Sequence, residues 1–325
     1  MACRIGYHCS HEQYAPGELL RLVTLAEQAG FQSAMCSDHY MPWSEEEGQS
    51  GFAWSWLGAA LQATKLPFGV VTVPGGWRYH PAVHAQAAAT LAEMFPGRFW
   101  MACGSGERLN EHVVGGAWPE KAERNARLRE GVEIMRALWA GETVTRRGRI
   151  PVDETKLYVR PSEPPKVVAA ALSPETAEWA GEWADGLITV VGEKEGMRNI
   201  IDAFRRGGGE GKPLYLQAQL SFAKTDGEAL EAAWKQWRAA MFPSPVLAEL
   251  KLPAHFDGAA EHTRREDVAK KMRISADPKR HLEWLLGDAE LGFEEINIHC
   301  VNRREQARFI EVFGERVLPE LAKAG

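Results

Sequence analysis

The adjacent pair Asp38–His39 is the most suggestive feature of the sequence for chemistry. A histidine changes charge near neutral pH, and a neighbouring carboxylate could orient or charge it, so the pair could move a proton. Trp43 follows behind Pro42, and its indole could stack on a planar ring. Asp–His pairs are common, however, and a buried histidine at a strand end or a loop tryptophan packed on the core would look the same. The segment alone leaves both interpretations open.

A second group of polar residues follows Gly104-x-Gly106. The two glycines could let a ligand approach the backbone closely, but the third glycine of the dinucleotide-binding fingerprint is missing. Glu107 could donate a proton if it is buried, and it is otherwise a solvated loop charge. Asn110 belongs to the same stretch.

The segment Leu172-Ser173-Pro174 predicts a helix start with a serine N-cap and a proline at the first helical position. Free backbone N–H groups at such a start attract phosphate. An ordinary capped helix gives the same pattern, and Glu175 already supplies negative charge in its first turn.

The run His8-x-x-His11-Glu12 could be interpreted as a set of metal ligands. Residues three apart in a loop do not face one ion unless a turn forces them to, so no metal site is expected. A metal-dependent hydrolase using His8, His11, Asp38 and His299 remains an alternative that elemental analysis would decide.

The residues above need a scaffold, and the sequence indicates one by alternating short apolar runs with helical periodicity. Eight parallel strands are predicted, at residues 4–7, 33–37, 68–72, 99–103, 167–171, 187–190, 214–219 and 295–299. Eight strands close an α/β barrel of the (β/α)8 TIM type, in one domain spanning residues 1–325. In such barrels the active site lies just past the C-terminal strand ends, which is where Glu12, His39 and Glu107 fall.

The predicted helices show apolar faces, and two connections are too long for simple crossovers. The faces consist of Leu19, Leu22, Val23 and Ala26; Ala82, Ala85, Ala89 and Ala92; Leu128, Val132, Met135 and Trp139; and Phe309, Phe313 and Val317 before a stop at Pro319. The long connections are insertions at residues 104–166, after strand 4, and 221–294, after strand 7. The first contains a helix near 120–141 and a hairpin-like stretch at 143–150.

Composition narrows the class of protein. The 325 residues are 45% hydrophobic and carry a net charge of -6 without basic clusters, so a large core and small-molecule ligands are expected, and nucleic acid is not. Five cysteines form no CxxC pair, which indicates reduced thiols in a cytoplasmic protein. No signal region and no run of ~20 apolar residues is found, so no membrane association is expected.

Several motifs in order resemble the bacterial luciferase-like oxidoreductases, and within them the F420-dependent glucose-6-phosphate dehydrogenases. The motifs are GYH at 6–8, SHEQ at 10–13, SDHYMPW at 37–43, RYHPA at 78–82, AQA at 85–87, GSGERLNE at 104–111, WP at 118–119, ERNARLRE at 123–130 and AGEWADG at 180–186. The similarity covers nearly the whole chain and thins through the second insertion.

The resemblance implies roles for individual residues. His39 is similar to the family's acid–base residue, Trp43 to its ring or substrate platform, and Glu107 to the carboxylate near the reduced ring's nitrogen. Glu12 and Asp38 resemble supporting pocket residues. Val71 and Thr72 match the turn where the family places a non-prolyl cis peptide behind the ring, and Asn110 and the segment at Leu172 and Ser173 match other cofactor-contacting positions.

The chain departs from those dehydrogenases in two places. Leu172-Ser173 stands where they have a Gly-Gly pair for the deazaflavin phosphate, so FMN and coenzyme F420 remain equally open as cofactors. Of the cations that hold the sugar phosphate, only Lys271 matches by position and Lys194 by neighbourhood, which argues against glucose 6-phosphate.

The expected function is therefore hydride transfer between FMN or F420 and a small organic substrate, as a dehydrogenase or a monooxygenase. A flavin reductase partner is expected if FMN is used, and a homodimer is expected from the family. A non-catalytic flavin-binding protein is a further alternative, because the family includes such members.

Overall fold

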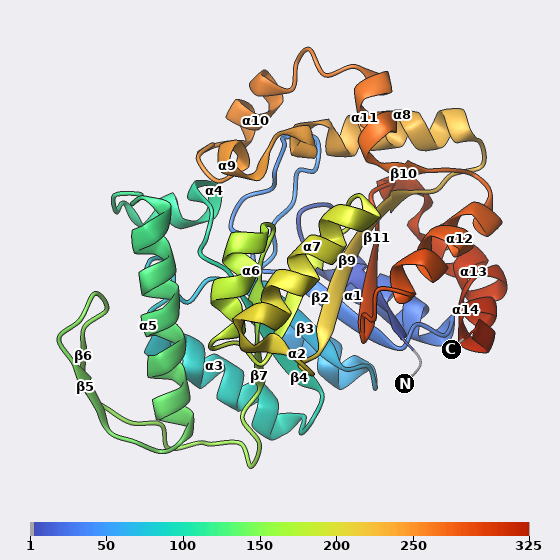
Figure 1. Cartoon of the computed structure of the whole chain (residues 1–325). Coiled ribbons are helices and arrows are strands. Elements are labelled where there is room, and N and C mark those ends of the chain that lie inside the picture. Colours follow the sequence, from blue (N-terminus) through green and yellow to red (C-terminus); the bar gives the residue numbers. More distant parts are fainter. Residues whose placement is uncertain (1–2, 325) are drawn as a thin grey trace.

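The computed structural model describes residues 3–324, and its centre is a closed barrel of parallel strands (Figure 1). The barrel strands are β1 (Arg4–Cys9), β2 (Ser33–Ser37), β3 (Phe68–Thr72), β4 (Phe99–Cys103), β7 (Lys166–Ala170), β8 (Gly186–Val190), β9 (Leu214–Ser221) and β11 (Glu295–Cys300). Pairing of β8 with β9 closes the ring. The predicted (β/α)8 barrel is confirmed, and each predicted strand end lies within two residues of an observed one.

The barrel interior is filled by side chains, as the fold requires. Trp100 and Tyr215 lie with their ring centroids 4.5 Å apart, in a cluster with Met35, Val168 and other buried residues. Gly69 on the neighbouring strand makes room for them, because a Cβ atom there would lie 2.1 Å from the Trp100 ring. The interior is therefore a packed core below the site.

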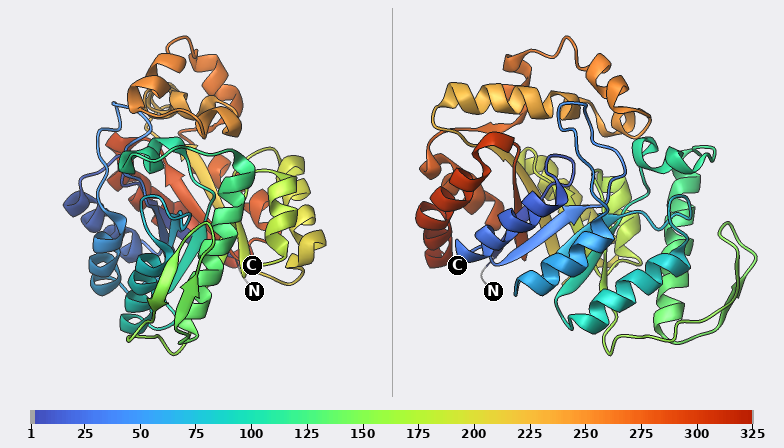
Figure 2. Two further views of the ribbon diagram at one scale, coloured as in Figure 1. Left: turned by 90° about the vertical axis from the view of Figure 1, so that its left-hand side faces the viewer. Right: turned by 180° about the vertical axis from the view of Figure 1, so that it is seen from behind.

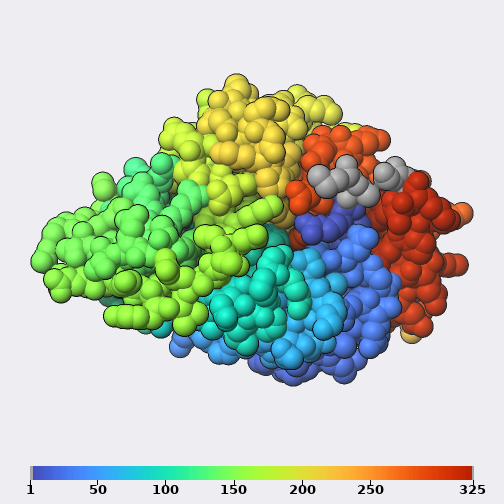
Figure 3. Space-filling model, turned by 90° about the horizontal axis from the view of Figure 1, so that it is seen from below, coloured from blue at the N-terminus to red at the C-terminus, as the bar shows by residue number. Residues whose placement is uncertain are grey.

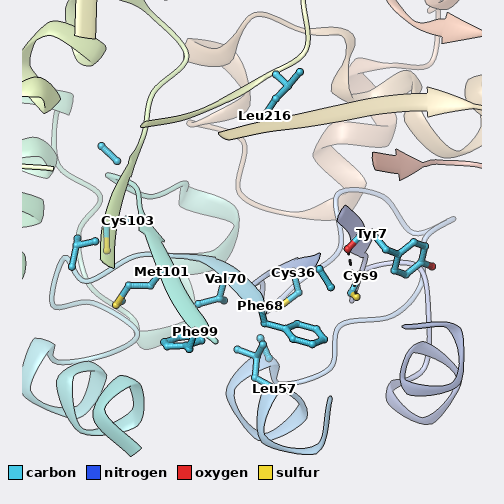
Figure 4. Close-up of a cluster of buried hydrophobic side chains, with 14 of the residues drawn as sticks. Tyr7, Cys9, Cys36, Leu57, Phe68, Val70, Phe99, Met101, Cys103 and Leu216 are labelled. Atoms are coloured by element: carbon cyan, nitrogen blue, oxygen red, sulfur yellow. Dashed lines mark hydrogen bonds between the residues drawn. The ribbon is translucent and has the colours of Figure 1, made fainter. Parts of the chain in front are cut away.

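Helices cover the outside of the barrel and bury the predicted apolar faces. They are α1 (Pro16–Gln28), α2 (Ala53–Ala63), α3 (Pro81–Met94), α5 (Lys121–Trp139), α6 (Pro174–Gly181), α7 (Lys194–Phe204) with η2 (Arg205–Gly209), α12 (Pro278–Ala289), η4 (Arg303–Glu305), α13 (Gln306–Arg316) and α14 (Leu318–Ala324). Figure 4 shows Leu57 of α2 beside Phe68 of β3, in the layer between helices and strands.

The predicted helix stop at Pro319 is wrong, because α13 ends at Arg316 and α14 begins at Leu318. A proline at the second position of a helix removes no hydrogen bond, since the first N–H groups have no partner within the helix. Pro319 therefore starts a new helix after a bend.

The first insertion holds α4 (Arg108–Glu111), η1 (His112–Val114), α5 and a hairpin of β5 (Val144–Arg146) and β6 (Val152–Thr155). The hairpin extends beyond the predicted stretch at 143–150, because its return strand begins at Val152, after the bend at 148–150. It projects from the body of the molecule beside α5 (Figures 1 and 3).

The second insertion holds α8 (Asp226–Trp237), η3 (Arg238–Met241), α9 (Ser244–Leu247), α10 (Pro253–Ala259), α11 (Arg265–Lys271) and the short strand β10 (Arg273–Ile274). Figure 2 shows these helices arching over one end of the barrel. This is the end at which the strands finish, because Phe256 of α10 contacts Trp43 in the loop after β2.

Candidate active site

His39 lies between two carboxylates that come from other strand ends. Its Nδ1 atom is 2.8 Å from Oε1 of Glu12, in the turn after β1, and its Nε2 atom is 4.0 Å from Oε2 of Glu107, after β4. The three residues meet because the C-terminal ends of neighbouring parallel strands share one rim. Ser10 supports Glu12 by donating a hydrogen bond from Oγ to the other carboxylate oxygen, at 2.9 Å.

The charges of these groups differ because their surroundings differ. Burial alone would lower the pKa of His39, but the charge and hydrogen bond of Glu12, together with the charge of Glu107, raise that pKa to about 9. Burial would raise the pKa of Glu12, yet His39 holds it well below its usual range. Burial raises the pKa of Glu107, with His39 opposing the rise. At neutral pH the site holds an imidazolium paired with Glu12, and His39 becomes a base as the pH approaches 9.

Trp43 packs its indole between His39 and the second insertion. The ring centroids of Trp43 and His39 are 5.3 Å apart, and those of Trp43 and Phe256 are also 5.3 Å apart, both edge to face. The indole thereby joins the loop after β2 to α10 and forms one wall beside the imidazole.

Asp38 points into the protein and accepts hydrogen bonds on both oxygens. Its donors are Trp54 Nε1 at 3.1 Å, Thr72 Oγ1 at 2.8 Å, Tyr79 OH at 3.0 Å and Arg78 Nη1 at 3.2 Å. A carboxylate with four donors fixes its loop in place. The contacts of Asp38 thus hold the backbone on which His39 is mounted.

Arg78 is a residue that the sequence patterns did not single out as functional. Its buried guanidinium lies between Asp38 and Glu111, with Nε 3.5 Å from Oε1 of Glu111. It therefore ties together the loops after β2, β3 and β4. The RYHPA motif at 78–82 contained it, but only the folded chain brings its two partners together.

Asn110 contacts the backbone of the loop after β2, which carries His39 and Trp43. Its Oδ1 atom accepts hydrogen bonds from the backbone N–H groups of Tyr40 at 2.8 Å and Met41 at 3.2 Å. Asn110 thus links the loop after β4 to the segment between His39 and Trp43.

The described residues contain no cis peptide bond, so the cis peptide implied at Val71 and Thr72 is wrong for this structure. Both residues stay in the ladder of β3, where the carbonyl of Val71 accepts from the N–H of Asp38 and that of Thr72 from Gly104. Regular pairing on both sides keeps the strand extended to its end.

Comparisons with known proteins identify the family of the chain. The family described as luciferase-like monooxygenase matches residues 2–295. The chain belongs to this family. Two similar relatives are F420-dependent glucose-6-phosphate dehydrogenases, from Beutenbergia cavernae and Nakamurella multipartita, each 35% identical over 98% of this chain and over 97% and 96% of the relatives.

Two solved structures superpose on nearly the whole chain. An F420-dependent secondary alcohol dehydrogenase in complex with an F420–acetone adduct has a TM-score of 0.90 at 30% identity, covering 99% of both chains. A coenzyme F420-dependent tetrahydromethanopterin reductase from Methanopyrus kandleri has a TM-score of 0.77 at 19% identity, covering 99% of this chain and 100% of its own, which shows the fold alone.

Four predicted residues of this luciferase-like protein do not join the cluster around His39. Lys194 pairs with Glu290 at 2.6 Å, and Lys271 donates to the carbonyl of Met241 at 2.8 Å. Leu172 is half exposed, and Ser173 caps α6 by accepting from the N–H of Thr176 at 3.3 Å. The residues next to the two lysines in the sequence gave no sign of these contacts, because the partners lie far away along the chain.

The histidines proposed for the metal-dependent alternative lie close together but are not arranged as ligands. His8 and His299 have ring centroids 4.4 Å apart, and burial lowers the pKa of both. Within residues 3–324, no group of three or more His, Cys, Asp or Glu side chains is placed to hold a metal ion. Over the same residues, no helix combines the length and apolar character that crossing a membrane requires.

Proposed function

We propose that this luciferase-like protein is an oxidoreductase in which hydride moves between F420 or FMN and a small organic substrate, with His39 as the acid–base residue. The observation that carries the proposal is the placement of His39 between Glu12 and Glu107, with the indole of Trp43 beside it. The named activities of the relatives, and the F420–acetone adduct of the solved structure, favour F420 over FMN.

A bound F420 or FMN ring would supply the hydride chemistry, and the residues of this chain would supply the proton. His39 is placed to give a proton to a carbonyl oxygen during reduction, or to take the hydroxyl proton of an alcohol during oxidation. Glu12 keeps the imidazolium available at neutral pH. Trp43 excludes water from one side of the imidazole.

The segment at the start of α6 fits the phosphate of either cofactor. Ser173 caps the helix, which begins at Pro174, and Lys121 Nζ donates a hydrogen bond to Thr176 Oγ1 at 3.1 Å in the same turn. The helix α6 has eight residues, and the combination of its N-terminus with a nearby lysine can bind an anion. We assign Leu172 and Ser173 to the cofactor's phosphate on this basis, with Asp38, Val71, Thr72 and Asn110 shaping the pocket.

The substrate we propose is an uncharged alcohol or carbonyl compound. Lys194 and Lys271 make contacts elsewhere, and Arg78 is shared between Asp38 and Glu111. Two of the cations that could hold a substrate phosphate, Lys194 and Arg78, are therefore already paired with carboxylates. Glucose 6-phosphate should be a poor substrate, and a short secondary alcohol should be a better one.

The first test is to titrate the purified protein with F420 and with FMN side by side, following absorbance and fluorescence. We expect binding of F420 with a dissociation constant of about 1 μM or tighter, and weaker binding of FMN. Failure to bind either cofactor at this level would reject the proposal. Preference for FMN would make a monooxygenase with a flavin reductase partner the better assignment.

The second test replaces His39 with asparagine. We expect turnover of F420 with a secondary alcohol to fall by about 10²–10⁴-fold, because no proton acceptor remains. The dissociation constant of F420 should stay unchanged. His262→Asn, at an exposed position of the second insertion, is the matched control. A His39→Asn variant with wild-type turnover would show that His39 does not carry the proton.

We also propose that the chain acts as one domain in the cytoplasm and assembles as a homodimer. The five cysteines form no disulfide bond, and four of them are buried. Free thiols are typical of proteins in a reducing compartment. Light scattering after size-exclusion chromatography would measure the oligomeric state, and a monomer at micromolar concentration would contradict the dimer.

A further inference from the structure

Glu47 is a fully buried carboxylic acid in the loop that carries His39 and Trp43, and the sequence patterns did not select it. Its Oε2 atom accepts a hydrogen bond from the backbone N–H of Trp43 at 2.7 Å. Its own N–H donates to Ser44 Oγ at 3.4 Å, and its carbonyl accepts from Arg303 Nη1 at 3.2 Å. The other carboxyl oxygen, Oε1, is buried without a hydrogen-bond partner.

These contacts connect Glu47 to the reaction through the backbone of Trp43. The indole of Trp43 lies edge to face against His39, so the direction of its backbone sets the position of the wall beside the imidazole. Arg303, after β11, anchors the backbone of Glu47 from the opposite side of the loop. Arg303 therefore fixes the backbone of Glu47, and the side chain of Glu47 in turn fixes the backbone of Trp43.

We propose that Glu47 is a positioning residue of the proposed oxidoreductase reaction, fixing the indole of Trp43 against His39. It acts on His39 through Trp43. This assignment rests on the proposed function for its effect on turnover, but its effect on the geometry of His39 can be measured without any cofactor.

The charge state of Glu47 suggests the right substitution for the test. The carboxyl accepts from the N–H of Trp43, and the charged groups that act on it are Glu12 from the turn after β1 and His39 from the same loop. Burial, together with the charge of Glu12, raises the pKa of Glu47 to about 8. A carboxyl with this pKa is mostly protonated at pH 7, so glutamine replaces it with the same acceptor and little change of charge.

The experiment compares Glu47→Gln, which keeps an oxygen for the Trp43 N–H, with Glu47→Ala, which removes it. Glu46→Ala, at the exposed neighbouring position, is the matched control. If Glu47→Ala does not fold, Glu47→Asp takes its place, because its shorter side chain withdraws the acceptor from the Trp43 N–H. Circular dichroism and the unfolding midpoint establish that each variant is folded.

The first readout is the NMR signal of the His39 ring in the cofactor-free protein, identified by its loss in His39→Asn. Because the Trp43 indole is 5.3 Å away, its ring current shifts these signals. We expect Glu47→Gln and Glu46→Ala to leave the His39 signals in place and Glu47→Ala to move them. Unmoved signals in a folded Glu47→Ala variant would overturn the proposal.

The second readout is turnover with F420 and a secondary alcohol. We expect Glu47→Ala to lose about tenfold to a hundredfold in kcat, because small displacements at a reacting centre are costly. Glu47→Gln should keep most of the wild-type kcat. Equal loss in both variants would also overturn the proposal. If the wild-type protein shows no turnover at all, the proposed function fails, while the NMR comparison still decides the role of Glu47.

Discussion

The imidazole of His39 gains its properties from an unequal pair of neighbours. Glu12 is buried and 2.8 Å away, whereas Glu107 is more exposed and 4.0 Å away. The close partner therefore determines the charge of the ring, and the distant one remains free to face a ligand. The sequence could suggest His39 as an acid–base residue, but it could not rank Glu12 above Asp38, the carboxylate next to it in the chain.

Replacing Glu12 with glutamine should change the pH dependence of the proposed reaction. Without the nearby charge, burial lowers the pKa of His39 from the value of about 9 that it has in the intact site. Alcohol oxidation needs the neutral imidazole, so its rate in the wild-type protein should rise with pH until about 9. In Glu12→Gln the rise should occur at lower pH. The measurement is the pH dependence of the rate with F420 and a secondary alcohol, for the wild-type protein and for Glu12→Gln. Identical pH profiles of the two proteins would contradict the effect of Glu12 on the pKa of His39.

The same pair contributes to folding stability in a defined pH window. The folded-state pKa of His39, about 9, lies above its unfolded value of 6.5, so this stabilisation is fully present below 6.5 and is lost as the pH rises through 9. We expect the wild-type protein to exceed Glu12→Gln in unfolding free energy by about 1–3 kcal/mol near neutral pH, and by less at alkaline pH. Urea unfolding across this range is the measurement. A constant difference would show that His39 and Glu12 do not titrate together.

At the scale of elements, the barrel strands could be predicted closely and the insertions only in outline. Strands buried on both faces are continuous apolar runs between turn residues, a signal that needs no partner to be recognised. The Arg78 contacts depend on residues distant in sequence, because Asp38 and Glu111 lie more than thirty residues from it. The contacts of Lys194 and Lys271 could not be predicted either, because Glu290 and the carbonyl of Met241 lie far from them along the chain.

Two helix glycines should respond oppositely to substitution by alanine. A Cβ atom at Gly131 of α5 would lie 2.2 Å from the carbonyl oxygen of Pro74, in the loop after β3, whereas one at Gly287 of α12 meets nothing within 4 Å. We expect Gly131→Ala to destabilise the protein by about 1–3 kcal/mol through overpacking. Gly287→Ala should stabilise it by about 0.5–1 kcal/mol, because alanine is the better helix former. Chemical unfolding measures both, and a neutral Gly131→Ala would mean that α5 can shift away from the barrel.

At the scale of the whole molecule, the second insertion forms its own apolar clusters over the end of the barrel. One of them unites Leu109 from the first insertion with Ala239, Phe256 and Ala260 from the second, and Trp43 packs against it. The backbone N–H of Arg108 also donates to the carbonyl of Ala248 at 3.0 Å. The two insertions thus meet above the site and close over it together.

Replacing Phe256 with alanine should loosen this cover before it affects the barrel. Phe256 is fully buried, and loss of such a ring costs about 3–5 kcal/mol. Because its cluster is separate from the main core, we expect faster amide hydrogen exchange across residues 242–260 and unchanged exchange in the barrel strands. Equal acceleration in the strands would show that the cover and the barrel unfold as one unit.

The contact between Trp43 and Phe256 has a consequence for how such proteins diversify. The proton chemistry is encoded in roughly the first third of the chain, at Glu12, His39 and Glu107, while the cover that faces it is encoded after residue 221. A recombination event that exchanged only the later segment would change the residues that face the substrate and keep Glu12, His39 and Glu107. The contact between Trp43 and Phe256 would then be the first place where such a chimaera needs a compensating substitution.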